Sequence, residues 1–448
     1  MSMRNARWTT IGAATLLLAS SCARPAPPRP RNLVIVTLDT TRADRLPMYG
    51  FASIETPAIG RLAREGVVFD QAMSVAPLTL TAHSSLFTGL YPPHHGVRDN
   101  ADRPLALDKA TIAEVLRARG FRTGAFVGST VLAADRGLSR GFDVYDDGAS
   151  AAGKAPRRRP ANEVIDDALA WLDSSHGSPF FAWVHLYDAH APQTLPDAFR
   201  RRYAGDSYAG GIAFADSQLG RLIDAMRAKG VLDSTAIIVA GDHGESLGEH
   251  GESEHGIFLY EGTLHIPMVM RAPGLPARRV TGLASLVDVL PTVVDLFGLE
   301  PMPVDGLDLV PTVRGRGDLP ERSIYAESMY ARRFGWSPLR AIRDGRFKLV
   351  DAPRPELYDL ETDPFEEHDL SAARPGLVNA MRAALPGFDA ETGREPSGTT
   401  PSVEAADVRA RLAALGYTSG TATLTPGQGR DPKDHIEEYN AARRGAMR

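Results

Sequence analysis

The sequence predicts an α/β fold with a mostly parallel central sheet, followed by a small antiparallel subdomain. Two observations predict it. From residue 32 onward, short and continuously apolar runs alternate with amphipathic helical segments, as in parallel sheets whose two faces are covered by helices. After residue 323 the apolar runs become shorter, and Asp344-Gly345, a dipeptide typical of hairpins, separates two of them.

The elements of the central sheet can be placed from these patterns. Strands are predicted over residues 33–38, 122–127, 180–186 and 236–240. Helices are predicted over residues 57–65, 111–119, 163–172 and 209–229, with Pro57 at a first helical position and Gly66 and Gly230 just after helix ends. The antiparallel strands are predicted over residues 323–329, 339–343 and 346–350.

The elements divide the chain into five parts. We expect a signal peptide over residues 1–22, a proline-rich linker over 23–31, the main α/β domain over 32–322, an antiparallel subdomain over 323–375, and a linker with a polar helical tail over 376–448. Two helices predicted in the tail, over residues 403–415 and 432–444, carry little apolar surface.

The composition excludes several classes of function. Of 448 residues, 43% are hydrophobic and 23% are charged, as in globular proteins. Because 50 Lys and Arg face 55 Asp and Glu, the net charge of −5 offers no basic field, and we expect no nucleic-acid partner. The single cysteine, Cys22, excludes an intrachain disulfide and a cysteine-based zinc site. The composition does not indicate an oligomeric state.

The first 22 residues have the architecture of a secretory signal. Arg4 and Arg7 precede a short apolar run over residues 11–19, well below the roughly 20 residues that span a bilayer. Small residues then precede Cys22, as in bacterial lipoprotein signals, whose cysteine is acylated and becomes the mature N-terminus. The alternative is a plain secretory signal with an incidental cysteine. We expect an exported, periplasmic or cell-envelope protein, anchored to a bacterial membrane by a lipid on Cys22.

Acidic residues and histidines follow three of the predicted strands. Asp39 follows the first strand, Asp188 and His190 follow the strand over 180–186, and Asp242-His243 follows the strand over 236–240. Because ligands bind beyond the carboxyl ends of strands in such sheets, these residues predict a site for a divalent metal such as zinc or manganese. Taken alone, the residues of each cluster have an alternative interpretation, as helix caps or turn residues.

A hydroxyl residue precedes a helix in the segment after residue 76. Thr79 lies before a helix predicted over residues 84–88 and ended by Gly89. Anions are favoured at helix N-termini. A coordinated metal can ionise a threonine hydroxyl there, so Thr79 is a candidate nucleophile toward a tetrahedral phosphorus or sulfur centre.

Five ordered motifs together resemble the sulfatase and type I phosphodiesterase branches of the alkaline phosphatase superfamily. They are VIVTLDTTRAD, LFTGLYPPHHGV, GDHGESLGEHG, VDVLPTVVDLFG and the ending RDGRFKLV with ELYDLETDP. The resemblance covers about residues 32–370 and implies an alkaline-phosphatase-like sandwich in a sulfatase-like catalytic domain.

The resemblance to sulfatases fails at the positions that carry their chemistry. Thr79 stands where sulfatases have the cysteine or serine that matures to formylglycine. Thr40 replaces the second Asp of an Asp-Asp pair, and Asp242-His243 replaces an Asp-Asn pair. The GKWHLG motif, which supplies sulfate-binding Lys and His, is absent from residues 127–130.

The same positions are similar to nucleotide pyrophosphatases and phosphoethanolamine transferases, which use a threonine nucleophile and a zinc-binding Asp-His pair. That resemblance implies a divalent ion held by Asp39, Thr79, Asp242 and His243, with zinc first and manganese or calcium as alternatives. Asn100 lies 21 residues after the threonine, where these relatives stabilise the oxyanion, and His255 lies 13 after the Asp.

The side chains outside the first metal site keep two interpretations open. Asp188, His190 and His255 are candidates for a second ion or for contact with the leaving group, and His190 and His255 are candidate catalytic residues.

Three functions are weighed from these observations. The first is a metal-dependent hydrolase or transferase of phosphate mono- or diesters, acting on a small anionic ester through a covalent Thr79 intermediate. The second is a sulfuric ester hydrolase that works without formylglycine. The third is an inactive, surface-tethered binding protein.

Overall fold

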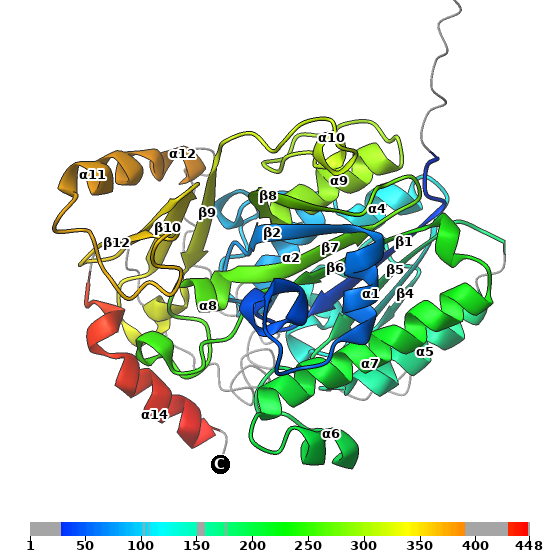
Figure 1. Ribbon diagram of the computed structural model, residues 1–448, viewed down its shortest axis with the longest axis horizontal. Helices are drawn as coiled ribbons and strands as arrows, with labels where there is room; N and C mark the ends of the chain where they lie inside the picture. Colours follow the sequence, from blue (N-terminus) through cyan, green and yellow to red (C-terminus); the bar gives the residue numbers. More distant parts are fainter. Residues whose placement is uncertain are drawn as a thin grey trace, which may run out of the picture.

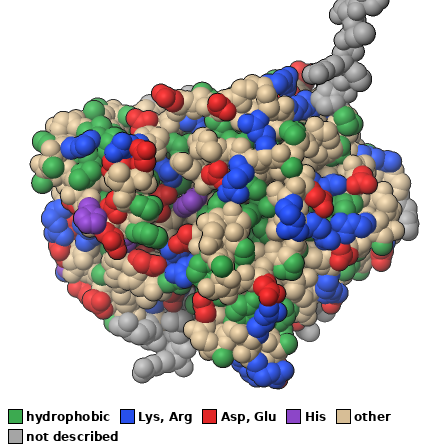
Figure 2. All heavy atoms as spheres, viewed as in Figure 1, with side chains coloured by type: hydrophobic (Ala, Val, Ile, Leu, Met, Phe, Trp, Pro, Cys, Tyr) green, Lys and Arg blue, Asp and Glu red, His purple; other side chains and the backbone are tan. Residues whose placement is uncertain are grey.

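The structure is a computed structural model that describes residues 28–446, apart from 102–103, 107, 150–156, 175–176 and 390–428. The signal sequence, Cys22 and the helix predicted over 403–415 lie outside the described residues. Among the residues that are described, no helix is both long enough and apolar enough to cross a membrane. Figure 2 shows acidic and basic side chains interspersed over one face of the molecule.

The central sheet has eight strands within the described part of the chain, in the order β4-β3-β5-β1-β6-β7-β2-β8 (Figure 1). The strands are β1 (Asn32–Leu38), β2 (Val67–Met73), β3 (Arg122–Val127), β4 (Val144–Asp146), β5 (Phe180–Leu186), β6 (Thr235–Gly241), β7 (His265–Arg271) and β8 (Arg278–Ser285). Only β7 runs antiparallel to its neighbours, β6 and β2, among these pairings. The predicted α/β fold with a mostly parallel sheet is confirmed.

The two faces of the sheet are buried by different helices, because successive side chains of a strand point to opposite faces. In β1, Leu33 and Ile35 pack with one apolar cluster, and Val34 and Val36 pack with the other. The first cluster includes side chains of α2 (Thr79–Thr88), α4 (Ile112–Arg117), α9 (Val289–Leu296) and α10 (Val310–Val313). The second includes α1 (Pro57–Glu65), α5 (Ala161–Asp173) and α7 (Ser207–Ala228). The short helices α3 (Pro92–His95), α6 (Asp197–Arg202) and α8 (Glu261–Leu264) lie in the connections.

A second, antiparallel sheet follows, in the order β12-β11-β10-β9. Its strands are β9 (Ser323–Ser328), β10 (Leu339–Asp344), β11 (Phe347–Asp351) and β12 (Glu356–Asp359). The hairpin between β10 and β11 turns at Gly345, whose positive φ of 54° suits glycine. The predicted antiparallel subdomain is thus present as a separate sheet.

The segment predicted as a linker from residue 376 differs from expectation. Residues there form α11 (Pro375–Ala384) and α12 (Pro386–Asp389). Val378 and Met381 of α11 are buried with Ile342 and Leu349 of the second sheet. An apolar helix face that matches an apolar sheet face explains why this segment packs instead of linking.

The last described helix, α14 (Ile436–Ala446), also differs from the predicted polar tail. Ile436 is 7% exposed and Tyr439 is fully buried. The helix lies below the second sheet in Figure 1, against the loop that follows β6. It is therefore part of the folded body.

Helix α7 contacts the end of β5 so closely that only glycine fits at one point. A Cβ at Gly211 would lie 2.2 Å from the carbonyl oxygen of Asp188. This approach places Tyr208, whose hydroxyl donates to the Thr40 carbonyl at 2.6 Å and accepts from the Arg42 amide at 3.0 Å. Helix α7 thus holds the turn that follows β1.

We expect Gly211→Ala to lower the free energy of unfolding by about 1–3 kcal/mol, because the added methyl forces the backbones apart. Gly220→Ala, in the same helix, is the matched control. Its Cβ would meet only the Ala58 methyl at 3.7 Å, so the change should be neutral or stabilising by up to about 1 kcal/mol. Denaturant unfolding of both variants measures this, and equal effects would contradict the packing argument.

Candidate active site

Three buried side chains meet at the carboxyl ends of neighbouring strands β1 and β6. Asp39 follows β1, and Asp242 and His243 follow β6, its parallel neighbour. Each of the three is fully buried, and one potential ligand atom from each lies within 4.8 Å of the others. In the described part of the chain this is the one such cluster of three. The structure brings these predicted metal ligands together.

The carboxylates in this cluster lack hydrogen-bond donors on the side that faces the cluster. Asp242 Oδ1 accepts from the amides of Thr40 at 3.1 Å and His243 at 2.7 Å, but Oδ2 has no hydrogen-bond partner. Neither oxygen of Asp39 has one. Burial raises the pKa of Asp39 to about 7, although the charges of His243 and Arg158 oppose the shift, and burial also raises the pKa of Asp242. Buried carboxylate oxygens without donors must either take up a proton or contact a cation, so the cluster suits a metal ion.

His243 turns its Nε2 toward Thr79 and Asp242. Its Nδ1 donates to the Gly244 carbonyl at 2.9 Å, because a carbonyl can only accept. In the neutral ring this leaves Nε2 with a lone pair, which is the form that binds metals. Nε2 lies 3.3 Å from the hydroxyl oxygen of Thr79.

Thr79 is the first residue of α2, so its hydroxyl sits at the positive end of that helix. The residue is 1% exposed. His83, one turn later, donates from Nδ1 to the Thr79 carbonyl at 2.7 Å and fixes the first turn. The predicted nucleophile therefore lies beside the metal cluster.

Asn100 reaches the same helix end. Its Oδ1 accepts from the Leu80 amide at 2.9 Å, and its buried Nδ2 has no hydrogen-bond partner. An amide N–H₂ next to the nucleophile is a free donor for an oxygen that gains negative charge. This placement fits the role implied by the spacing of Asn100 from Thr79.

A histidine that the sequence analysis did not single out, His185 in β5, lies next to Asp39. Its Nε2 is 3.1 Å from Asp39 Oδ2, although the two atoms do not form a hydrogen bond. Its Nδ1 contacts the hydroxyl of Thr37 at 3.0 Å. Within an apolar strand sequence this histidine is indistinguishable from a core residue, so only the fold reveals it.

A second group of histidines lies at one side of the cluster. The His255 ring is 4.5 Å from the His243 ring and 5.0 Å from the His190 ring, measured between centroids. His255 Nδ1 is 2.8 Å from Glu245 Oε1. His190 Nδ1 donates to the Ala191 carbonyl at 2.6 Å, and its ring stacks on Tyr187. Burial lowers the pKa of both histidines well below the usual range.

The structure gives Asp188 a role other than metal binding. Both of its carboxylate oxygens accept from the Ala161 amide, at 3.1 and 3.0 Å, at the start of α5. A carboxylate at a helix N-terminus is held by the unpaired amides and the helix dipole. Asp188 therefore caps α5, and the set of Asp188, His190 and His255 does not form a second metal cluster.

The chemistry of the four donor groups in the cluster indicates which ion would fit. Two carboxylates, an imidazole nitrogen and a hydroxyl suit zinc or manganese, whereas calcium prefers six to eight oxygens. A cation fits here because three carboxylate oxygens, both of Asp39 and Oδ2 of Asp242, have no hydrogen-bond partner.

This fold and this site together define a class of protein, the ester hydrolases that hold a divalent metal beside a side-chain nucleophile. The chain belongs to the sulfatase family, since the family model described as Sulfatase matches residues 31–299. A second model, described as N-sulphoglucosamine sulphohydrolase, C-terminal, matches residues 248–383. Enzymes of the family use a divalent metal, which the cluster at Asp39 could hold.

Individual relatives agree with this assignment. Human arylsulfatase A is 26% identical over 83% of this chain and 90% of its own length. Choline-sulfatase of Rhizobium meliloti is 37% identical over 41% of this chain and 35% of its own. The crystal structure of phosphonate monoester hydrolase of Agrobacterium radiobacter superimposes with a TM-score of 0.69, 24% identity and coverage of 84% of this chain and 99% of that one, which shows a common fold.

We expect zinc affinity to fall below neutral pH. Burial raises the pKa of Asp39 to about 7 in the metal-free protein. Below that pH the ion must displace a proton, so the apparent Kd should rise about tenfold per pH unit, and above it this dependence should end. Competition with a chromophoric chelator between pH 5 and pH 9 measures the curve. The control is Asp216→Asn, since Asp216 is a buried carboxylate that accepts from the Ala58 and Ile59 amides and not from the cluster. A Kd independent of pH below 7 would contradict the assignment.

Proposed function

We propose that this chain hydrolyses phosphoric esters of small anionic substrates through a covalent intermediate on Thr79. The observation that carries the proposal is the placement of the Thr79 hydroxyl at a helix N-terminus, 3.3 Å from His243 Nε2. Three carboxylate oxygens of the neighbouring metal cluster have no hydrogen-bond partner. Phosphate monoesters and diesters both satisfy the chemistry of this site.

Asp39, Asp242, His243 and Thr79 would hold the ion. When bound, a divalent ion lowers the pKa of a coordinated hydroxyl and polarises a phosphoryl oxygen. The remaining side chains act on the substrate directly. The amide nitrogen of Asn100 donates to the oxygen that gains charge, and the N-terminus of α2 favours that charge as well.

The reaction balances over two displacements. In the first, the bond from Thr79 Oγ1 to phosphorus forms while the bond to the leaving oxygen breaks. His255, whose Nδ1 contacts Glu245, starts as a neutral ring, and we assign to it the relay that accepts the proton lost by Thr79 and delivers it to the leaving alcohol. In the second, water attacks the phosphothreonine, and His255 accepts the water proton and passes it to the departing Thr79 oxygen, which recovers its hydroxyl. An acceptor alcohol in place of water would give a transferase.

The choice of phosphate over sulfate rests on the nucleophile. Formylglycine forms at a cysteine or serine, whose β-carbon can become an aldehyde, but the β-methyl of Thr79 prevents this. The alternative, sulfuric ester hydrolysis by the threonine alkoxide, is favoured by family membership and by the arylsulfatase relatives. The third function, an inactive binding protein, is disfavoured, because this chain has every type of donor group that the first metal site needs.

A substrate panel with zinc or manganese separates the two esters. We expect bis(para-nitrophenyl) phosphate to be hydrolysed with a kcat/KM at least about 100-fold above that for para-nitrophenyl sulfate. The reverse ratio would establish the sulfatase alternative. Saturating metal with no turnover of either ester would instead favour a binding protein.

Variants of Thr79 test the nucleophile. Thr79→Ala should lower kcat by about 10³-fold or more, because the covalent route is lost, while Thr79→Ser should retain part of the activity. Thr88→Ala is the control, since Thr88 is a buried threonine at the far end of α2 whose hydroxyl donates to the Ser84 carbonyl. Trapping of ³²P on wild-type protein and its absence from Thr79→Ala would complete the test. Full activity of Thr79→Ala would refute the proposal.

We also propose that the protein is exported and tethered to a membrane by a lipid on Cys22, the only cysteine. In a bacterial host, Cys22→Ala should move the protein from the membrane fraction to the soluble periplasmic fraction, because the acylation site is lost. Salt washing controls for electrostatic adsorption. An unchanged membrane fraction would contradict lipid anchoring.

A further inference from the structure

The C-terminal helix α14 contacts the loop that carries His255 at several successive points. The Tyr439 hydroxyl donates to the His255 carbonyl at 2.6 Å. Asn440 donates to the Gly251 carbonyl at 2.7 Å and accepts from the amide and hydroxyl of Ser253, at 3.2 and 2.9 Å. One helix therefore satisfies both backbone and side-chain groups of residues 251–255.

A buried ion pair continues this contact. Arg443 donates from Nε to Glu254 at 2.7 Å and also from Nη2. Arg443 is 3% exposed and Glu254 is 5% exposed. Removing one partner of such a pair strands a buried charge, so the pair fixes the helix and the loop relative to each other. Arg443 also lies near enough to His190, His255 and Glu245 to influence them electrostatically.

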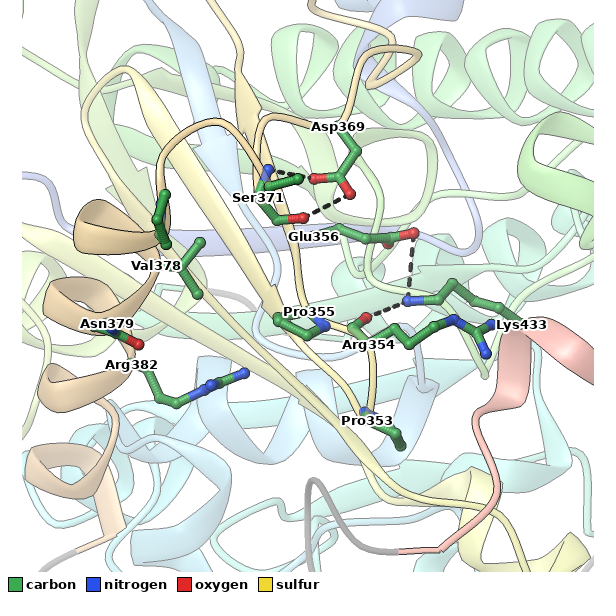
Figure 3. A pocket seen from close by; sticks show the side chains of 12 residues that line it. Pro353, Arg354, Pro355, Glu356, Asp369, Ser371, Val378, Asn379, Arg382 and Lys433 are labelled. Atoms are coloured by element: carbon green, nitrogen blue, oxygen red, sulfur yellow. Dashed lines mark hydrogen bonds and ion pairs between the residues drawn. The ribbon is translucent and has the colours of Figure 1, made fainter.

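The start of the C-terminal segment is fixed to the second sheet. Lys433 Nζ donates to the Arg354 carbonyl and pairs with Glu356 at 3.3 Å, across a pocket of about 550 Å³ between this segment, β12 and α11 (Figure 3). Arg354 in turn pairs with Asp434 at 2.7 Å. Helix α14 is thus anchored at one end before it reaches the active-site loop.

The loop itself has no regular secondary structure. Residues 252–259 belong to no helix or strand. Within the loop, Glu252 accepts from the Ile257 and Phe258 amides, at 2.8 and 3.1 Å.

Other segments also hold the loop close to His255. Ser328 of β9 donates to the Gly256 carbonyl, and the Ser246 amide donates to the Glu254 carbonyl at 2.7 Å. Tyr439 makes the contact on the His255 carbonyl itself, and the His255 ring contacts Glu245.

We propose that Tyr439 and Arg443 are positioning residues of the active site, which hold His255 where it acts on the leaving group. The proposal rests on the proposed function of His255 in proton transfer. It assigns the C-terminal helix, which the sequence pattern predicted to be a polar tail, to the catalytic machinery. Displacement of a catalytic group by about 1 Å can cost up to 100-fold in rate, so the loss of one fixing contact should be measurable.

A double-mutant cycle tests the proposal in the full-length protein. Tyr439→Phe should lower kcat about tenfold, with KM and zinc content unchanged, because it removes only the hydroxyl that holds the His255 backbone. In a His255→Ala background the same substitution should change kcat by less than about twofold, since there is no imidazole left to position. A merely structural role would give equal effects in both backgrounds.

The matched control is Tyr145→Phe. The Tyr145 hydroxyl donates to the Leu132 carbonyl, also at 2.6 Å, in the edge strand β4. This variant should leave kcat unchanged. The ester is whichever of bis(para-nitrophenyl) phosphate and para-nitrophenyl sulfate the wild type hydrolyses, so the failure of the phosphoesterase proposal does not mask this test.

Variants of Arg443 provide a second readout. Arg443→Ala should lower kcat more than Tyr439→Phe does, and Arg443→Lys should recover part of the loss by restoring the charge beside Glu254. The inference is overturned if Tyr439→Phe behaves like Tyr145→Phe, if its effect persists in the His255→Ala background, or if His255→Ala alone retains full activity. Loss of activity in Thr79→Ala with no effect of Tyr439→Phe would reject only the positioning role.

Discussion

The site depends on one constraint, which is that two carboxylates, Asp39 and Asp242, are buried side by side with oxygens that accept no hydrogen bond. Neighbouring parallel strands impose this closeness, because β1 and β6 end together at the same edge. The turn after β1 is held in a left-handed conformation at Thr40, with φ of 49°, which is costly for a β-branched residue. Two hydrogen bonds offset this conformational cost. The Thr40 amide donates to Asp242, and the hydroxyl of Tyr208 donates to the Thr40 carbonyl.

Much of this arrangement could be predicted from the sequence, since strand ends in a doubly wound sheet converge on one edge. The rule succeeded for Asp39 and Asp242, but it could not distinguish a carboxylate that faces the site from one that caps a helix. Asp188 follows β5 at the same edge and caps α5. The reversed strand β7 was not predicted at all, and even a predicted buried apolar run would carry no sign of its direction. His185 escaped because a histidine within such a run is typical of core.

A helix was predicted over residues 432–444, but its packing against the rest of the structure was missed for a different physical reason. Amphipathicity measures how an apolar face meets an apolar partner. Among the side chains of α14 that the structure describes, the buried apolar ones are Ile436 and Tyr439. Its other contacts are made by Asn440 and Arg443 with a polar loop, through hydrogen bonds and a buried ion pair. Recognition between polar surfaces leaves no periodic signal in either segment. Only the folded structure shows that the tail and the loop of His255 satisfy each other's polar groups.

The hydrogen bonds around Thr79 show independently that Asp39 shares a proton or a metal ion with a neighbouring histidine. His83 donates from Nδ1 to the Thr79 carbonyl, and burial lowers its pKa to about 3, so its Nε2 must accept the single hydroxyl proton of Thr37. The Thr37 oxygen then accepts from Trp183 and from Nδ1 of His185. Burial lowers the pKa of His185 to about 4, so its Nε2 keeps a lone pair, 3.1 Å from a carboxylate oxygen of Asp39. Two acceptors at that separation repel each other unless a proton or a metal ion lies between them.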